Sequence, residues 1–400
     1  MKKLFTSLFI VLVLLSGCTS TSSQQPVSTA VNSTPVIITI TSEQSQALDN
    51  YITTRENAVK DKDEQSFLSL FNSSDEFYFN EQKSWFADCK KQNVKNYNLI
   101  IASATKISQD SFSATLTETF TINNSKRTYT YNLVFQKFDD GYKEIGIDME
   151  LMQLDGYNIY YNKTAKDYAD EIKTIYNTRT KTLYKLFGYT PSFVGQVRIY
   201  DNMATMRGTI KPSTPNWVAG WNEYRQSIKI AVYENASFST VKDYIDETIL
   251  HEQTHALLSD LSNDNLNYFM QEGCAMLFSG QKYELTDSDI KTLKSLYSKK
   301  YDMLNLNELE DTHLEDLESP NSNYYYIISK AYCYIIYKDH GIDGLKSLLK
   351  ELKTHEYIEL TANDKLDNIN DLTNEALKKV LNEDTSTLTN KLEKYLSELK

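Results

Sequence analysis

The sequence is poor in glycine, proline and cysteine, and each shortage excludes a class of protein. Its 400 residues include 12 Gly and 6 Pro, too few for a collagen-like or proline-rich scaffold. Apart from Cys18 near the N-terminus, the cysteines are Cys89, Cys274 and Cys333, which can form one disulfide at most. A disulfide framework is therefore excluded. Since there is no CxxC pair, a metal site built from thiolates is not expected either.

Basic residues are outnumbered as well. The chain has 42 Lys and Arg against 54 Asp and Glu, for a net charge of -12 at pH 7. Because binding to nucleic acid requires a basic face, no nucleic-acid partner is expected. The hydrophobic fraction of 40%, with 29 Tyr and 16 Phe, is enough for a folded core and excludes disorder over the whole length.

The sequence has no hydrophobic run long enough for a membrane span, and its longest apolar run lies near the N-terminus. Lys2 and Lys3 precede the apolar run Leu4–Leu15. This run is shorter than the roughly 20 residues of a membrane span and fits the core of a signal peptide. The residues up to Cys18 (Leu-Ser-Gly-Cys) resemble a bacterial lipobox, in which the Cys becomes the lipid-modified first residue of the mature protein. The alternative is an ordinary signal peptide with a chance Cys.

The lipobox predicts a chain that is anchored to the cell membrane by lipid on Cys18 and works on the extracytoplasmic face. Residues 1–18 are then the signal peptide with its lipobox Cys. Residues 19–40 are rich in Ser and Thr and show no periodic pattern, which is typical of a tether between membrane and folded body.

Residues 41–161 are predicted to form an accessory α+β domain. Two helical stripes come first, and then Ser111–Ile122 and Tyr129–Phe138 alternate apolar with polar residues, as strands do. Asp140 and Gly141 predict a hairpin after the second strand. This order of elements, with Trp85 and Phe86 ahead of the first strand, resembles the nuclear-transport-factor-like cone fold.

Residues 162–400 are predicted to form a second, mostly helical domain with a small sheet. Tyr168–Phe187 has a helical pattern that Gly188 ends, Gln196–Tyr200 and Ser227–Val232 have the pattern of strands, and the chain after Phe238 is helical. The predicted fold class of the whole chain is therefore α+β.

One motif in this second domain carries chemistry, the pentad that runs from His251 to His255 (His-Glu-Gln-Thr-His). His251 and His255 lie at i and i+4, so both imidazoles can point at one ion from one face of a helix. Glu252 can then reach a water bound to that ion. The chain has only 5 His, so the occurrence of two in one pentad is informative.

A catalytic zinc requires three protein ligands and one open position, so a third ligand is needed. A second predicted helix, Leu266–Met276, follows after a polar turn and carries Glu272. If this helix reverses against the first, Glu272 completes a His₂Glu set, which is a known hydrolytic arrangement.

The segments HEQTHALL and NYFMQEGCAMLF resemble the thermolysin-like zinc peptidases of the Glu-zincin group, and most of all the peptidase-MA-like bacterial domains. The resemblance covers residues from about 165 to about 350. It implies a zincin domain in which His251, His255 and Glu272 hold one zinc ion and Glu252 is the general base.

The same resemblance suggests two further features. An edge strand ahead of the zinc helix lines the substrate cleft in this family, and Trp217–Trp221, with Gly220 and Trp221, occupies that place. Tyr326 matches a Tyr that stabilises the oxyanion in related domains. The alternative for Tyr326 and for the two tryptophans is ordinary packing.

One departure from the family concerns the residue that orients a zinc-bound His. Members commonly carry an acidic residue one turn after the Glu ligand, where this chain has Met276. Because a zinc-bound His almost always donates its second N–H to an acceptor, the acceptor must come from elsewhere. Glu247, four residues before His251, and a backbone carbonyl are the two candidates.

The sequence therefore predicts a lipid-anchored, extracytoplasmic zinc metallopeptidase whose partners are a peptide or protein substrate and the membrane. Two alternatives remain open. One is a catalytically inactive envelope lipoprotein that uses the zincin scaffold for binding, and the other is a metallohydrolase that acts on a non-protein amide such as one in the cell wall.

Overall fold

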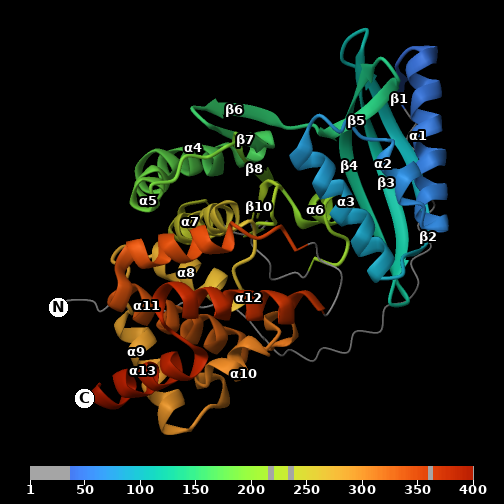
Figure 1. Cartoon of the computed structure of the whole chain (residues 1–400). Helices are drawn as coiled ribbons and strands as arrows, with labels where there is room; N and C mark the ends of the chain where they lie inside the picture. The colour runs from blue at the N-terminus through green and yellow to red at the C-terminus, as the bar shows by residue number, and fades with distance from the viewer. Residues whose placement is uncertain (1–36, 215–219, 233–237, 359–363, 400) are drawn as a thin grey trace, which may run out of the picture.

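The computed structural model describes residues 37–214, 220–232, 238–358 and 364–399. The signal peptide with Cys18 and the residues Trp217–Ala219 lie outside these ranges. The described chain forms two five-stranded sheets with helices packed against them, which confirms the predicted α+β class. In Figure 1 the first sheet stands beside α1, while the helices from α7 onward gather at the far end of the molecule.

The first sheet has the strand order β1-β2-β3-β4-β5. Its two-residue turn between β3 and β4 is formed by Asn123 and Asn124, which both have a positive φ, as a tight hairpin requires. Gly141, with φ 118°, starts β5 where the sequence predicts the hairpin. The strands are β1 (Ile37–Thr39), β2 (Lys95–Lys106), β3 (Ser111–Ile122), β4 (Ser125–Phe138) and β5 (Gly141–Ile147).

Three features of this half differ from the sequence analysis, and one of them is β2, which precedes the first predicted strand. β1 lies within the segment expected to be a tether and pairs in parallel with β2, which suits the β-branched residues of Ile37–Thr39. The helices are α1 (Ser42–Asp61), α2 (Glu64–Leu68) and α3 (Glu76–Lys91). α3 is not predicted from the sequence, because its buried face mixes Trp85 and Phe86 with the polar Glu81 and Gln82.

Glu118 of β3 is fully buried beneath the helix α6 (Met203–Thr209). Burial raises the pKa of Glu118 to about 7, although the guanidinium of Arg55 opposes this shift. The folded protein therefore holds this proton more tightly than the unfolded chain does. The stability that it contributes is fully present below the unfolded pKa of about 4.3 and is lost as the pH rises through about 7.

We expect Glu118→Gln to remove this part of the pH dependence. At about 1.4 kcal/mol per pKa unit, Glu118 alone should lower the free energy of unfolding by roughly 3 kcal/mol between acid and mildly alkaline pH. Urea unfolding at about pH 5 and about pH 8 measures the difference between the wild type and the variant. The exposed Glu398 provides the matched Glu→Gln control. An identical pH dependence in the wild type and Glu118→Gln would contradict the expectation.

The second sheet has the order β6-β7-β8-β10-β9, which makes β9 an edge strand. β7 pairs with β8, and β8 with β10, in parallel. The division between the two sheets falls between Ile147 and Glu150, upstream of residue 161, because β7 joins the second sheet through β8. The strands are β6 (Glu150–Leu154), β7 (Tyr157–Tyr161), β8 (Gly195–Tyr200), β9 (Gly220–Trp221) and β10 (Ile228–Ala231).

The helical pattern over Tyr168–Phe187 corresponds to two helices joined by one π-helical turn, Tyr176–Thr180. Gly188, with φ 63°, ends the second of them as predicted. Gly341 has non-helical angles and breaks α11. The helices of this half are α4 (Lys166–Ile175), α5 (Lys181–Phe187), α6 (Met203–Thr209), α7 (Phe238–Ser262), α8 (Tyr268–Ser279), α9 (Asp287–Ser298), α10 (Leu306–Glu310), α11 (Asn321–Leu352), α12 (Asp364–Leu381) and α13 (Thr385–Glu398).

α3 connects the two halves, and it lies between the first sheet and α6 in Figure 1. Gln82 Nε2 donates a hydrogen bond of 2.9 Å to the carbonyl of Thr209. The Ser213 backbone N–H and hydroxyl both donate to Asp88, each at 2.8 Å. These contacts hold α3 against the second half through buried or half-buried polar groups, which require such partners.

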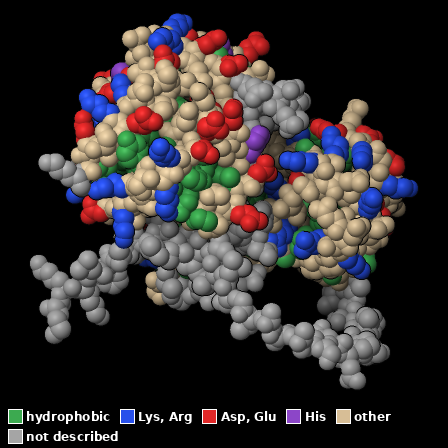
Figure 2. Space-filling view, turned by 90° about the horizontal axis from the view of Figure 1, so that it is seen from below, with side chains coloured by type: hydrophobic (Ala, Val, Ile, Leu, Met, Phe, Trp, Pro, Cys, Tyr) green, Lys and Arg blue, Asp and Glu red, His purple; other side chains and the backbone are tan. Residues whose placement is uncertain are grey.

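The surface agrees with the composition. Figure 2 shows acidic and basic side chains interspersed on one face, without a continuous basic area. None of the helices within the described ranges has the length and hydropathy needed to cross a membrane.

Candidate metal centre

α7 carries the histidine pentad and is held between two cores. Ile245 and Ile249 pack into the core beneath the second sheet, whereas Leu250, Leu257 and Leu258 pack into the core formed by the C-terminal helices. With apolar contacts on both sides, the rotation of α7 about its axis is fixed. The side chains between these two apolar faces, including both histidines of the pentad, are thereby held in place.

His251 and His255 project from the same side of α7, one turn apart. Their ring centroids are 4.7 Å apart, and their Nε2 atoms are 3.0 Å apart. Two ring nitrogens that face each other this closely are not a favourable pair by themselves when both are neutral acceptors. The arrangement points both Nε2 atoms at a common position.

α8 brings Glu272 to the same position. Asn263 and Asp264, both with positive φ, reverse the chain after α7, and Asn267 caps α8 by accepting a hydrogen bond from the backbone N–H of Met270. Glu272 Oε2 then lies 3.3 Å from His251 Nε2 and 3.4 Å from His255 Nε2. The structure thus brings together the three residues that the sequence predicts as ligands.

The three donor atoms have the spacing of a tetrahedral zinc site. With metal–ligand bonds of about 2.0–2.2 Å, two ligands of a tetrahedral zinc are separated by roughly 3.3 Å. The separations here are 3.0, 3.3 and 3.4 Å. Glu272 Oε2 is buried and has no well-formed hydrogen bond from any residue in the described ranges. Such an oxygen requires a partner, and a cation bound by all three residues would supply it.

The charge states of His255 and Glu272 depend on each other. Although burial favours the neutral forms, the Glu272 carboxylate raises the pKa of His255 to about 9. The same interaction holds the pKa of Glu272 well below its ordinary value, in spite of its burial. In the metal-free protein the protonated His255 thus balances the ionised Glu272, and a divalent cation that binds to these residues would take the place of that proton.

Gln271 orients His255, and the sequence analysis missed it. Its Oε1 lies 3.4 Å from His255 Nδ1, where it accepts the ring N–H and leaves Nε2 free to bind a metal. Gln271 Nε2 donates to Ser259 Oγ at 3.4 Å, and that hydroxyl donates to Asp264 at 2.7 Å. The only signal in the sequence was a Gln next to the Glu ligand, which is also common on exposed helix faces. For His251, Glu247 and a backbone carbonyl remain the predicted acceptors.

We expect Gln271→Leu to weaken zinc binding by about 10- to 100-fold, the usual effect of removing the group that orients a metal-bound His. The substitution keeps the volume of the side chain and deletes the acceptor for His255 Nδ1. Competition with a chelator measures the zinc affinity. Gln281→Leu, at an exposed position beyond α8, is the matched control. Equal affinities for the two variants would show that Gln271 does not act on the metal centre.

Glu252 lies beside the three residues and is 7% exposed. Burial raises its pKa, while the two histidines oppose that shift and Glu272 adds to it. The nearby backbone N–H of Asn222 also opposes the shift. An acid whose pKa is raised toward neutrality can both accept and return a proton, which is what a general base in hydrolysis must do.

β9 lies next to α7 and contains the two residues predicted to line a cleft, Gly220 and Trp221. Gly220 pairs with Ile230 of β10, and a Cβ at this position would lie 2.7 Å from the carbonyl oxygen of Lys229. The same Cβ would lie 3.5 Å from Thr248 of α7, so β9 runs close to the turn before His251. The absence of a side chain at Gly220 therefore allows the close approach of β9 to Lys229 and Ile230 of β10.

Tyr326 of α11 also faces the centre. Its ring centroid lies 6.4 Å from that of His251. Burial, together with the negative charges of Glu272 and Glu252, raises the pKa of Tyr326 well above its ordinary value. Its hydroxyl thus stays protonated and can donate a hydrogen bond.

Other groups that could have bound a metal are accounted for differently. His340 lies near Asp339 and Glu383, but Lys391 Nζ lies 2.7 Å from Asp339 and also contacts Glu383, so a cation already balances these carboxylates. The free thiols are buried: Cys89, Cys274 and Cys333.

Comparison of the chain with protein-family models gives no match, and a search of curated proteins gives none either.

Proposed function

We propose that this protein is a zinc-dependent peptidase that is anchored by lipid on Cys18 at the extracytoplasmic face of the membrane. The observation that carries the peptidase proposal is the convergence of His251, His255 and Glu272 on one position beside the buried Glu252. The anchor rests on the lipobox in the sequence alone.

In this proposal His251, His255 and Glu272 hold the zinc ion, and Gln271 keeps His255 in the tautomer that binds through Nε2. A zinc ion bound there would act as a Lewis acid that polarises the scissile carbonyl and makes an attacking water more acidic. The other steps belong to side chains of the protein.

Glu252 accepts a proton from the water as its oxygen forms a bond to the carbonyl carbon. When the carbon–nitrogen bond breaks, Glu252 returns that proton to the leaving amine. Burial raises the pKa of Glu252, which makes its carboxylate a better acceptor for the proton of the water.

Two further elements suit a peptide substrate. β9 pairs with β10 on one side only, so its other edge can add an extended peptide as a further strand. The protonated Tyr326 hydroxyl can donate to the carbonyl oxygen as it becomes negatively charged.

Cleavage of a fluorescence-quenched peptide library by the full-length chain tests this proposal. We expect activity that a chelator abolishes and added zinc restores. If the chain cleaves a cell-wall amide and none of the peptides, this would favour the alternative of a metallohydrolase that acts on a non-protein amide. If the zinc-loaded chain hydrolyses neither kind of substrate, this would favour the alternative of a catalytically inactive lipoprotein that uses the scaffold for binding.

A further inference from the structure

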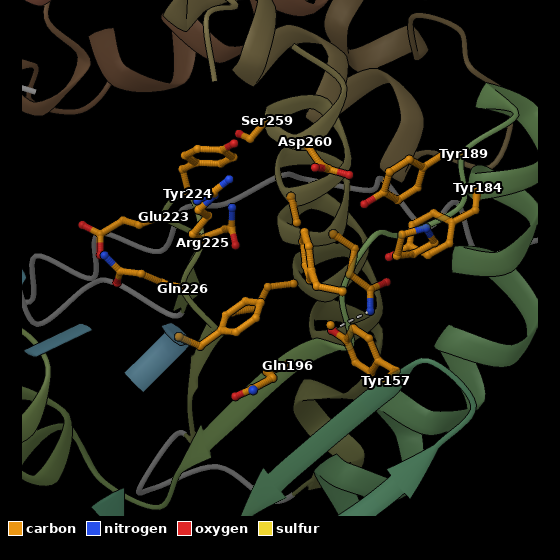
Figure 3. Close-up of a pocket in the computed structure, with 18 residues that line it drawn as sticks. Tyr157, Tyr184, Tyr189, Gln196, Glu223, Tyr224, Arg225, Gln226, Ser259 and Asp260 are labelled. Atoms are coloured by element: carbon orange, nitrogen blue, oxygen red, sulfur yellow. Dashed lines mark hydrogen bonds between the residues drawn. The ribbon is translucent and has the colours of Figure 1, made fainter. Parts of the chain in front are cut away.

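A pocket opens on the side of α7 next to Glu252, and the proposed chemistry does not use it. It lies between α7, β8, the loop after β9 and the tip of α3. In Figure 3 Asp260 and Ser259 lie on one side of the pocket, and Tyr157 and Gln196 lie on the opposite side. Tyr184 and Tyr189 close a third side.

Two residues that line the pocket also lie next to residues of the candidate metal centre. Asn222 lines it and contacts Glu252 through its backbone N–H. Ser259 lines it and accepts the hydrogen bond from Gln271, the residue that orients His255. A substrate placed on β9 therefore passes the mouth of this pocket, because Asn222 directly follows β9.

The walls are aromatic and held in place. Tyr184 and Tyr189 meet edge to face with ring centroids 5.0 Å apart, and Phe77 of α3 meets Phe193 at 5.3 Å. Tyr157 accepts a hydrogen bond of 3.1 Å from Gln253. Fixed aromatic faces of this kind bind apolar groups, and they bind cations through their ring faces.

The charges of the pocket distinguish between these two kinds of occupant. Glu223 lies 3.5 Å from Lys229 Nζ, and Arg225 lies 3.2 Å from Glu76, so both are compensated. Lys353 Nζ donates to the backbone carbonyl of Asp260 at 2.7 Å, but no Lys or Arg of the described ranges forms an ion pair with the Asp260 carboxylate. Burial, together with the negative charge of the nearby Asp260, raises the pKa of Tyr189 well above its ordinary value. The carboxylate keeps further acceptor positions.

The loop that forms the wall opposite Tyr184 and Tyr189 is held by α3. Asn80 Nδ2 donates to the carbonyl of Arg225 at 3.0 Å, and Gln226 Nε2 donates to Ser84 at 2.7 Å. The Ser227 backbone N–H donates to the buried Glu81 at 3.1 Å. The N-terminal half of the chain therefore takes part in forming this pocket.

We propose that this pocket binds a basic side chain of the peptide substrate, with the aromatic rings around its stem and Asp260 paired with its positive charge. This inference rests on the proposed peptidase activity and adds a substrate class to it. An Arg or Lys side chain fits because its alkyl stem packs on aromatic faces while its charged end requires an acceptor.

A panel of peptides tests the proposal in the zinc-loaded, full-length chain. Each position on either side of the scissile bond is Arg, citrulline, Leu or Phe in turn, and citrulline serves as the uncharged analogue of Arg. At one position we expect kcat/KM to be about tenfold or more higher for Arg than for citrulline, the usual worth of a charge-assisted contact. Asp260→Asn should abolish this preference, so that its kcat/KM for the Arg peptide and for the citrulline peptide are the same.

Two variants complete the experiment. Asp260→Glu keeps the charge and should retain a preference for Arg. Asp343→Asn, at a position where the side chain is 89% exposed, should behave as the wild type. Equal cleavage of Arg and citrulline peptides by the wild type, a preference for Phe or Leu at every position, or an Arg preference that survives Asp260→Asn would each overturn the proposal.

A binding experiment distinguishes failure of the peptidase proposal from failure of the pocket proposal. If the wild type cleaves no peptide, the affinities of the Arg and citrulline peptides for the Glu252→Gln protein decide the question of the pocket. Tighter binding of the Arg peptide that depends on Asp260 would support the site, and equal binding would overturn it.

Discussion

Glu252→Gln is expected to abolish hydrolysis while the protein keeps its zinc. The amide has the shape of the carboxylate but cannot take the proton of the attacking water, so we expect kcat to fall by about 10²- to 10⁴-fold. Glu252 is not one of the three converging donors, and therefore its loss should leave the metal site intact. Peptide cleavage and metal content, measured on the same preparation, test both parts.

Glu284→Gln provides the control, because Glu284 is exposed in the loop after α8. This variant should retain the activity of the wild type. If Glu252→Gln retained it as well, the role of Glu252 as a general base would be wrong. If Glu252→Gln lost the zinc together with the activity, Glu252 would have to be counted among the ligands.

Gly273→Ala is expected to have the second large effect, this time on stability and metal binding together. A Cβ at Gly273 would lie 2.3 Å from the carbonyl oxygen of Ser329 and 2.6 Å from Cys333 Sγ, both on α11. Backbone cannot give way as a flexible side chain does, so α8 must move away from α11. Overpacking of this kind costs about 1–3 kcal/mol or more, and the shift carries Glu272, the next residue, out of position.

Thermal or urea unfolding of the metal-free protein measures the first effect, and competition with a chelator measures the second. Gly280→Ala is the matched control at the end of the same helix, where the nearest atom to an added Cβ is the carbonyl oxygen of Leu277, at 3.3 Å. An unfolding free energy and a zinc affinity unchanged by Gly273→Ala would contradict the close packing of α8 on α11.

The candidate site shows what local sequence patterns can predict. The spacing of His251 and His255 is set by the geometry of one helix turn, so the pentad alone predicts that they share a face. Glu272 depends on a chain reversal, which the polar turn before α8 indicates. Gln271 could not be predicted, because its role follows from the side of α8 that faces His255, and this depends on how two helices pack.

The fold divides in the same way. The period-2 pattern of β3 and the turn at Gly141 are local, and the structure agrees with both. α3 was missed because its buried face carries Glu81 and Gln82, whose partners are Ser227, just before β10, and Thr209 of α6, more than a hundred residues along the chain. Polar residues that are buried by distant partners look like exposed residues in a local pattern. The pairing of β7 with β8 across the predicted boundary at residue 161 is likewise non-local.

The central claim is that His251, His255 and Glu272 hold one zinc ion, and the metal content of the purified full-length chain tests it most directly. After incubation with zinc and removal of the excess, we predict about one zinc per chain for the wild type and for Glu252→Gln. The double variant His251→Ala/His255→Ala should hold almost none. A wild-type protein that binds no zinc, or a double variant that binds as much as the wild type, would contradict the account.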